Sequence, residues 1–283
     1  MNNAEQHDTF LDELGIGPVW KLRDSSVSAA NISHVADVTP VTHVVMPRPP
    51  LIPASHGLLN AVVSDSVPDA TRTLAPATTD MHQPLSIVPA VSAAVADMDW
   101  TDLESTVAAC RACQLCEGRA NTVFGIGDQR AKWLFVGEGP GYQENLQGKP
   151  FVGPAGHLLD NILRALGMQR GENTYIANIV KCRPTDAQGK DRAPSPEEVA
   201  ACLPYLKRQI ALIQPEVIIA LGKTAAVSLL DLNPETPVGQ LRGKLHRYQN
   251  LPLVVTYHPA YLLRKPTEKS KTWEDLCLAL RSM

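Results

Sequence analysis

The fold is decided by the segment WLFVGEGPG, which spans residues 133–141. Its first half, WLFV, has the length and composition of a short buried strand, and a glycine-rich turn follows directly. Because glycine has no Cβ, such a turn can approach a ligand closely and offer it backbone N–H groups. The segment is neither a Walker loop nor a G-x-G-x-x-G fingerprint, since no Gly-Lys-Ser/Thr follows. Taken alone, it is equally compatible with a tight turn that exposes Glu138 to solvent.

Strands and helices alternate after this segment. Apolar runs predict strands over residues 174–182, 216–222 and 251–259, and amphipathic patterns predict helices over residues 155–167, 195–213, 223–230 and 267–283. Ser195 is the expected N-cap of the second helix, with Glu198 completing a capping box. The alternation predicts an α/β fold with three αβα layers around a central, mostly parallel, four-stranded sheet. Ligands bind beyond the carboxyl ends of the strands in such sheets, where the GEGPG turn, Asn178 and His258 are expected.

The first hundred residues differ from the rest of the chain in composition and charge. Residues 1–24 form a short amphipathic segment, which is interpreted either as a disordered tail or as a docking segment for a protein partner. Residues 25–100 form a linker rich in Ala, Val, Pro and Ser, without helical or strand periodicity, and we expect it to be disordered. The formal charge is −7 over residues 1–100 and +4 over residues 101–283, the predicted folded domain.

Neither a membrane span nor an export signal is apparent. No segment approaches the roughly 18 apolar residues that a membrane helix requires. The start, MNNAEQHDTFLDELG, is acidic and lacks an apolar core, which argues against a signal peptide. We therefore expect a cytoplasmic protein, in the bacterial cytosol or nucleoid, whose cysteines stay reduced rather than forming disulfides.

Four cysteines have the pattern of a metal site. Cys110 and Cys113 form a C-x-x-C pair, and Cys182 and Cys202 follow at the expected end of a strand and on the capped helix. Four thiolates suit either a tetrahedral zinc ion or an iron–sulfur cluster. Two alternatives stay open: Cys182 and Cys202 are ordinary buried cysteines, or Cys116, which extends the pair to C-x-x-C-x-x-C, competes as a ligand.

Two further motifs combine rigid loops with residues that suit nucleic-acid chemistry. Phe151 lies among glycines and prolines in GKPFVGPAG, where an aromatic ring either stacks a base or packs the loop. His258 opens HPAYLLR and is fixed by the proline that follows, in a position to meet a developing negative charge or to serve the fold. Arg264 and Lys265, beside it, are candidates for contacts with DNA phosphates.

The joint order of these motifs resembles the family 4, or iron–sulfur, uracil-DNA glycosylases. GEGPG, GKPFVGPAG, NIVKCRP and HPAYLLR follow a C-x-x-C pair in that order, and the resemblance extends from about residue 103 to 280. It implies that Cys110, Cys113, Cys182 and Cys202 hold a [4Fe–4S] cluster. It also implies that Glu138 acts near the sugar and the attacking water and that His258 faces the uracil carbonyl. The implied substrate-binding residues are Gly139, Glu144, Phe151, which would stack the extruded uracil, and Asn178, which would bind its pyrimidine edge.

The implied activity is that of a monofunctional DNA-repair hydrolase. It would release uracil from single- or double-stranded DNA, leave an abasic site for base excision repair and act as a monomer. Covalent trapping on DNA, known in a sister group, is not expected, because the segment RPTDAQGKDRAPSP lacks a histidine. The alternatives are a glycosylase for thymine or hypoxanthine, a non-catalytic Fe–S module that recruits repair or replication partners, and a zinc-ribbon regulator. We expect the cluster to pin loops near the DNA backbone, surrounded by four basic residues: Lys181, Arg183, Lys190 and Arg192.

Overall fold

The computed structural model describes residues 95–283. The amphipathic segment 1–24 and most of the predicted linker lie outside the described residues. The described part begins inside the predicted linker: Val95 is buried, and helix α3 (Trp100–Ala109) starts at a tryptophan. The Trp100 ring packs edge-on against Phe124 and Tyr175, with centroids 5.3 and 5.4 Å away. The folded domain therefore includes residues 95–100.

The sheet has six strands, not the four that were predicted. They are β1 (Ile126–Gly127), β2 (Trp133–Gly137), β3 (Thr174–Asn178), β4 (Val217–Leu221), β5 (Leu245–Tyr248) and β6 (Leu251–Thr256). Their spatial order is β1-β3-β2-β4-β6-β5. The four central strands are the predicted ones and are mutually parallel, whereas β1 and β5 pair antiparallel at the two edges. The edge strands escaped prediction because β1 has only two residues and β5 is mostly exposed and polar.

The long helices lie where the amphipathic patterns placed them. They are α5 (Pro154–Ala165), α6 (Pro196–Ile213), α7 (Lys223–Leu230) and α10 (Lys269–Leu280). The predicted cap of α6 is confirmed, since the Glu198 N–H donates to Ser195 Oγ (3.3 Å) and the Ser195 N–H donates to the Glu198 carboxylate (2.7 Å). Shorter helices connect these elements: α4 (Tyr142–Gln147), α8 (Val238–Leu241), α9 (Pro259–Arg264) and the 3-10 turns η1 (Gln114–Cys116) and η2 (Pro266–Glu268).

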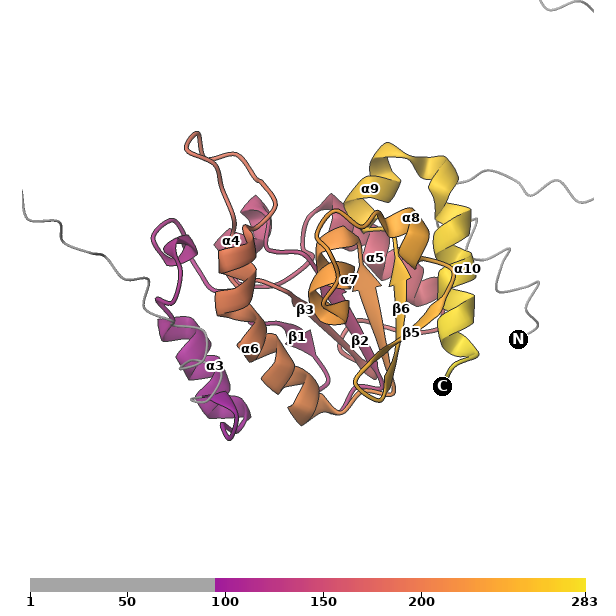
Figure 1. Ribbon diagram of the computed structural model, residues 1–283, viewed down its shortest axis with the longest axis horizontal. Helices are drawn as coiled ribbons and strands as arrows, with labels where there is room; N and C mark the ends of the chain where they lie inside the picture. The colour runs from indigo at the N-terminus through magenta and orange to yellow at the C-terminus, as the bar shows by residue number, and fades with distance from the viewer. Residues whose placement is uncertain (1–94) are drawn as a thin grey trace, which may run out of the picture. The chain divides into compact units, whose positions relative to one another are not determined.

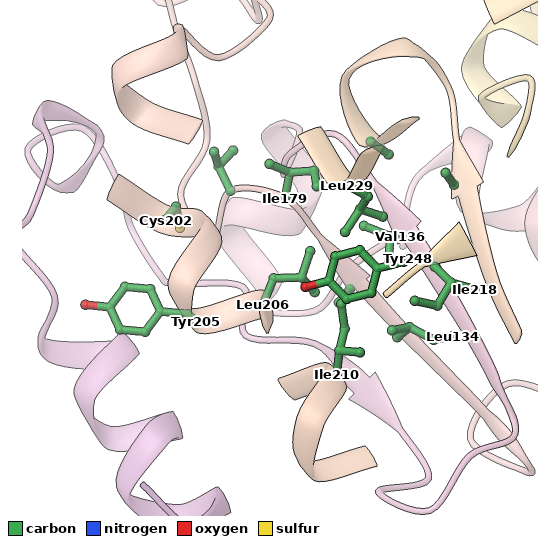
Figure 2. Packing of buried hydrophobic residues seen from close by; sticks show 14 of the residues in the cluster. Leu134, Val136, Ile179, Cys202, Tyr205, Leu206, Ile210, Ile218, Leu229 and Tyr248 are labelled. Carbon is green, nitrogen blue, oxygen red and sulfur yellow. The ribbon is translucent and has the colours of Figure 1, made fainter. Parts of the chain in front are cut away.

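Helices cover both faces of the sheet, which gives the three predicted layers (Figure 1). An apolar cluster lies between the sheet and the helices on each face. On one face Leu134, Val136 and Ile218 meet helices α3, α6 and α7. Figure 2 shows Leu206 and Ile210 of α6 pointing toward these strand residues. On the other face alternate strand residues, such as Phe135 and Ile219, meet α5, α9 and α10. Burial of one such side chain contributes about 1.5–3 kcal/mol, so the layers are held mainly by this packing.

The parallel arrangement brings the carboxyl ends of the four central strands to one edge. Gly137, the last residue of β2, is directly paired with Asn178, the last residue of β3. Gly222 follows β4, and Tyr257 and His258 follow β6. None of the helices within residues 95–283 is long and apolar enough to cross a membrane.

Candidate functional site

A cavity of about 660 Å³ opens at this edge of the sheet. Its wall contains residues that follow or end each of the four central strands: Glu138, Asn178, Gly222 and His258. Most of the residues singled out in the sequence line this cavity, namely Glu138, Gly139, Glu144, Phe151, Asn178, His258 and Arg264. Lys265 is exposed and does not line it.

The base of the cavity holds a buried hydrogen-bond acceptor without a partner. Asn178 is only 2% exposed, and its Oδ1 accepts no hydrogen bond from the described residues. A Cβ at Gly137 would lie 2.4 Å from this oxygen and 2.7 Å from Phe151 Cζ, so only glycine lets the two side chains meet here. An unpaired buried acceptor costs about 1–3 kcal/mol, a cost that a ligand with a matching donor removes.

The backbone of Phe151 has an unusual conformation, which hydrogen bonds from Arg170 hold in place. Its backbone has φ 54°, in the left-handed region that non-glycine residues rarely adopt. Arg170 donates from Nη2 to the Phe151 carbonyl (2.8 Å) and from Nη1 to that of Pro150 (2.9 Å), while Asp160 accepts from its Nε. A Cβ at Gly156 would lie 1.8 Å from the Phe151 carbonyl oxygen, which requires glycine there. The ring joins the apolar cluster beneath it and also lines the cavity, so it packs the loop, while its stacking on a base stays a prediction.

His258 stacks on Phe151 with ring centroids 5.5 Å apart and serves as the N-cap of α9. Its Nδ1 accepts a hydrogen bond from the Ala260 N–H (3.1 Å). This bond assigns the remaining ring proton to Nε2. Burial, assisted by the charge of Arg264, lowers the pKa of His258 to about 4. At neutral pH the residue is therefore an uncharged imidazole whose Nε2–H is the available donor.

Glu138 is oriented by a residue that the sequence analysis did not identify. The Thr224 hydroxyl, in the first turn of α7, donates a short hydrogen bond to Glu138 Oε2. This contact fixes one carboxylate oxygen of a residue that lines the cavity. The one signal available in the sequence was the position of Thr224, directly after a strand end at the expected ligand-binding edge.

Glu144 braces two loops of the cavity wall. Its Oε2 accepts from the Gly141 N–H (3.1 Å), and its Oε1 accepts from the N–H groups of Val152 (3.2 Å) and Gly153 (3.4 Å). The carboxylate thus ties the turn after β2 to the loop that carries Phe151. A direct contact of Glu144 with substrate stays a prediction.

A second, smaller recess gathers five cysteines from separate parts of the chain. Cys110 caps the end of α3, Cys113 caps the start of η1 and Cys116 is the last residue of η1. Cys182 follows β3 and Cys202 lies on α6. Burial raises the pKa of Cys113 and Cys182, and it raises the pKa of Cys202 to about 12. Since a metal binds the thiolate, these thiols ionise only if a cationic group offsets that cost.

The donor set of this recess fits an iron–sulfur cluster. The Lys181 N–H donates to Cys202 Sγ (3.2 Å), Arg119 to Cys182 Sγ (3.4 Å) and the Tyr205 hydroxyl to Cys110 Sγ (3.3 Å). Within residues 95–283, no three His, Cys, Asp or Glu side chains are arranged to hold one metal ion. Several cysteines that line one recess, three of whose sulfurs accept hydrogen bonds, form a donor set of the kind that binds iron–sulfur clusters.

Lys181 borders the cysteine recess, as expected, but its side chain is buried in the core. The residue is 1% exposed, and its Nζ donates to the Asn178 carbonyl (3.0 Å) and to Gln209 Oε1 (2.6 Å). Burial lowers the pKa of Lys181 to about 8. The side chain points between the sheet and α6, where two acceptors replace water. The loop before α6 carries the other basic residues named with it: Arg183, Lys190 and Arg192. Lys190 is exposed, and Arg192 makes a bidentate ion pair with Glu198 (2.8 and 2.6 Å).

Comparison with known proteins identifies the family. Residues 124–277 match the model of the uracil DNA glycosylase superfamily. A type-4 uracil-DNA glycosylase of Pyrobaculum aerophilum is 40% identical over 187 residues, which cover 64% of this chain and 93% of that protein. The chain belongs to the type-4 uracil-DNA glycosylases.

Other relatives agree with this assignment. The type-4 enzyme of Archaeoglobus fulgidus is 40% identical over 62% of this chain and 88% of its own length. That of Thermotoga maritima is 44% identical over 55% of this chain and 78% of its own length. A type-5 uracil-DNA glycosylase of Pyrobaculum aerophilum is 27% identical over 48% of this chain and 64% of its own length, so the type-4 members are the more similar group.

Proposed function

We propose that this type-4 family member hydrolyses the N-glycosidic bond between uracil and deoxyribose in DNA, releasing uracil and leaving an abasic site for base excision repair. The observation that carries the proposal is the meeting of three groups in one cavity: the unpaired acceptor of Asn178, the neutral donor of His258 and the braced Phe151 ring. A buried base needs these features together: an acceptor, a donor and a flat apolar surface.

Binding requires that the nucleotide leave the base stack, because its glycosidic bond is shielded inside a duplex. The extruded uracil stacks on the Phe151 ring. The ring is in position before uracil binds, because Arg170 holds the Phe151 carbonyl and Gly156 leaves room for it. The Asn178 amide accepts from the uracil N3–H and donates to its O4. Cytosine presents the opposite pattern, with an acceptor at N3 and a donor at N4, so the same amide rejects it.

Cleavage of the C1′–N1 bond creates a uracil anion and a cationic sugar, and the cavity offers a group for each. His258 donates from Nε2 to the uracil O2 as negative charge develops there, and a preorganised donor of this kind is typically worth about 3 kcal/mol. Being uncharged, His258 gives no proton away and acts by hydrogen bonding alone. Glu138, held by Thr224, stabilises the sugar cation and accepts a hydrogen bond from the attacking water.

The cysteine recess supports the proposed site through the fold. Cys110, Cys113, Cys182 and Cys202 would hold a [4Fe–4S] cluster, which supplies a cross-link between α3, the end of β3 and α6. Cys116 borders the same recess and is the fifth thiol. Because Cys182 lies four residues after Asn178, this cross-link also steadies the strand end that reads the base.

The direct test is incubation with oligonucleotides that carry one deoxyuridine, single-stranded or paired with G or A, followed by alkali cleavage at abasic sites. We expect strand scission at the uracil, free uracil in the supernatant and no covalent protein–DNA adduct. Oligonucleotides with thymine or hypoxanthine at the same position are the specificity controls. Absence of scission with all uracil substrates, using protein that carries its full complement of iron, would overturn the proposal.

A further inference from the structure

The cavity extends beyond the groups that would bind uracil. Its volume of about 660 Å³ exceeds that of one pyrimidine base, and its outer wall is built from other residues. On one side these are Tyr142 and Gln143 of α4, together with Asp191 and Arg192 of the loop that precedes α6. A strand that delivers its uracil to Asn178 and His258 therefore also passes this wall.

Tyr142 is the most solvent-exposed large hydrophobic residue among those described, with 54% of its surface accessible. A single exposed aromatic residue is unremarkable in itself. Here, however, the ring lines the cavity, and the Arg183 guanidinium lies over it, 5.1 Å from the centroid. Arg183 is anchored in turn by Asp191 (2.5 Å) and by the Gly189 carbonyl (3.1 Å). The ring is thus supported on one face by an ordered cation while much of its surface remains open.

We propose that Tyr142 is a stacking site for the nucleobase next to the extruded uracil on the same strand. The proposal rests on the proposed function, because the neighbouring base reaches Tyr142 only when uracil occupies the inner cavity. Extrusion of a nucleotide unstacks its neighbours, and a tyrosine ring at the mouth of the cavity replaces one lost stacking partner. Every base has a π-face, so this contact is independent of sequence.

Nucleic acid, rather than a protein, is the occupant that the surroundings favour. Tyr142 shares its cavity with the proposed base-reading residues, Arg183 lies over its ring, and Arg192 lines the same cavity. Leu146 provides a comparison within the same helix. It lies one turn further along α4 and is 49% exposed, but it does not line the cavity. Only the exposed apolar residue that faces the DNA path is therefore assigned to the stacking site.

The test is a double-mutant cycle between Tyr142 and the DNA. Binding is measured by fluorescence anisotropy with single-stranded oligonucleotides that carry a hydrolysis-resistant 2′-fluoro-arabinouridine. Companion oligonucleotides lack the base on its 5′ side or on its 3′ side. We expect Tyr142→Ala to weaken binding of the intact oligonucleotide by about tenfold, within the range for the loss of one stacked base. Removal of one neighbouring base should weaken DNA binding by the wild-type protein to a similar extent. The same removal should have little further effect on DNA binding by Tyr142→Ala.

Two variants serve as controls. Tyr142→Phe keeps the ring and should bind as the wild type does. Leu146→Ala removes an equally exposed apolar side chain from the same helix and should also be unaffected. The stacking site would be overturned if Tyr142→Ala bound DNA normally. It would also be overturned if, for both neighbouring bases, removing the base weakened binding by Tyr142→Ala as much as it weakens binding by the wild type, so that the two losses multiply. If the wild-type protein releases no uracil from an ordinary deoxyuridine oligonucleotide, it is the proposed function that fails; if it does release uracil and the losses multiply, only the stacking proposal fails.

Discussion

The proposed uracil cavity and the cysteine recess come close in the sequence at the end of β3, where Asn178 lines the first and Cys182 the second, but they are stabilised in different ways. In the cavity, the protein itself holds each reactive group: Thr224 holds Glu138, the Ala260 N–H holds His258 and Arg170 holds the backbone of Phe151. In the recess, the thiols lie in surroundings that raise the pKa of Cys113, Cys182 and Cys202. The cavity is therefore organised before any ligand arrives, whereas burial in the recess favours neutral thiols, so thiolate ligands form there only when a bound group offsets that cost.

This difference predicts that changes in the recess act mainly on the fold and changes in the cavity act mainly on the reaction. The four predictions that follow test this division, beginning with the largest expected effect.

Cys202→Ala should have the largest effect, because it removes a proposed ligand of the cluster, and loss of the metal is coupled to unfolding. We expect loss of most of the bound iron and of the visible absorption. We also expect a fall in the unfolding midpoint of roughly 10 °C or more, on a scale of about 2–4 °C per kcal/mol for a domain of this size. Iron analysis and thermal unfolding measure both effects. Cys116→Ala is the matched control and should keep its iron; if that variant loses the cluster instead, the ligand assignment is wrong.

His258→Ala should lower the single-turnover rate by about 10²–10³-fold, the usual range for one preorganised donor to a developing anion. Ground-state uracil carries no such charge, so the affinity for DNA and the unfolding midpoint should change little. Rapid-quench kinetics at saturating enzyme, together with anisotropy binding, separates the two quantities. A variant that binds poorly but cleaves bound substrate at the normal rate would make His258 a structural residue.

Thr224→Val should lower the rate by about tenfold, because it removes the hydroxyl that orients Glu138 while keeping the shape of the side chain. Thr224→Ser retains the hydroxyl and should recover most of the activity. The iron content of both variants should equal that of the wild type, which marks the effect as belonging to the cavity. Equal rates for Thr224→Val and Thr224→Ser would show that the hydrogen bond from the residue 224 hydroxyl does not orient Glu138.

The smallest expected effect is a change in the pH dependence of stability. The pKa of His258 is about 4 in the folded protein, below the ordinary value of about 6.5. Between these values the unfolded chain binds the proton more readily, so acidification from pH 6.5 toward pH 4 lowers the free energy of unfolding. Below pH 4 this loss is complete. Denaturant titrations at several pH values should show a shallower decline for His258→Ala than for the wild type, with carboxylates contributing equally to both. If the free energy of unfolding of the two proteins declined equally with falling pH, His258 would not be held in its neutral form by the fold.

Elements and residues with a strong local signal were predictable from the sequence. The four central strands are continuous apolar runs, and the capped start of α6 follows from Ser195 and Glu198. Asn178 and His258 were expected at one edge because parallel strands place their carboxyl ends together. The resemblance to a known family then assigned roles that no local pattern contains.

Features that depend on distant partners were not predictable. Thr224 and Glu138 are 86 residues apart in the sequence, so no local sequence pattern predicts their hydrogen bond. The burial of Lys181 was not predicted, because it depends on Gln209, 28 residues later, which supplies an acceptor inside the core. The edge strands β1 and β5 depend on pairing with their neighbours more than on their own composition.

Asn178, which lines the cavity, and Cys182, which lines the cysteine recess, lie only four positions apart in the sequence. Within this segment the Lys181 backbone N–H reaches Cys202 Sγ and its side chain reaches the Asn178 carbonyl, so both ends are fastened to one residue. A substitution that shifts the end of β3 to admit a larger base therefore also displaces a cysteine ligand. New base preferences are more accessible by exchanging other side chains that line the cavity, such as Phe151 and His258, than by reshaping this strand.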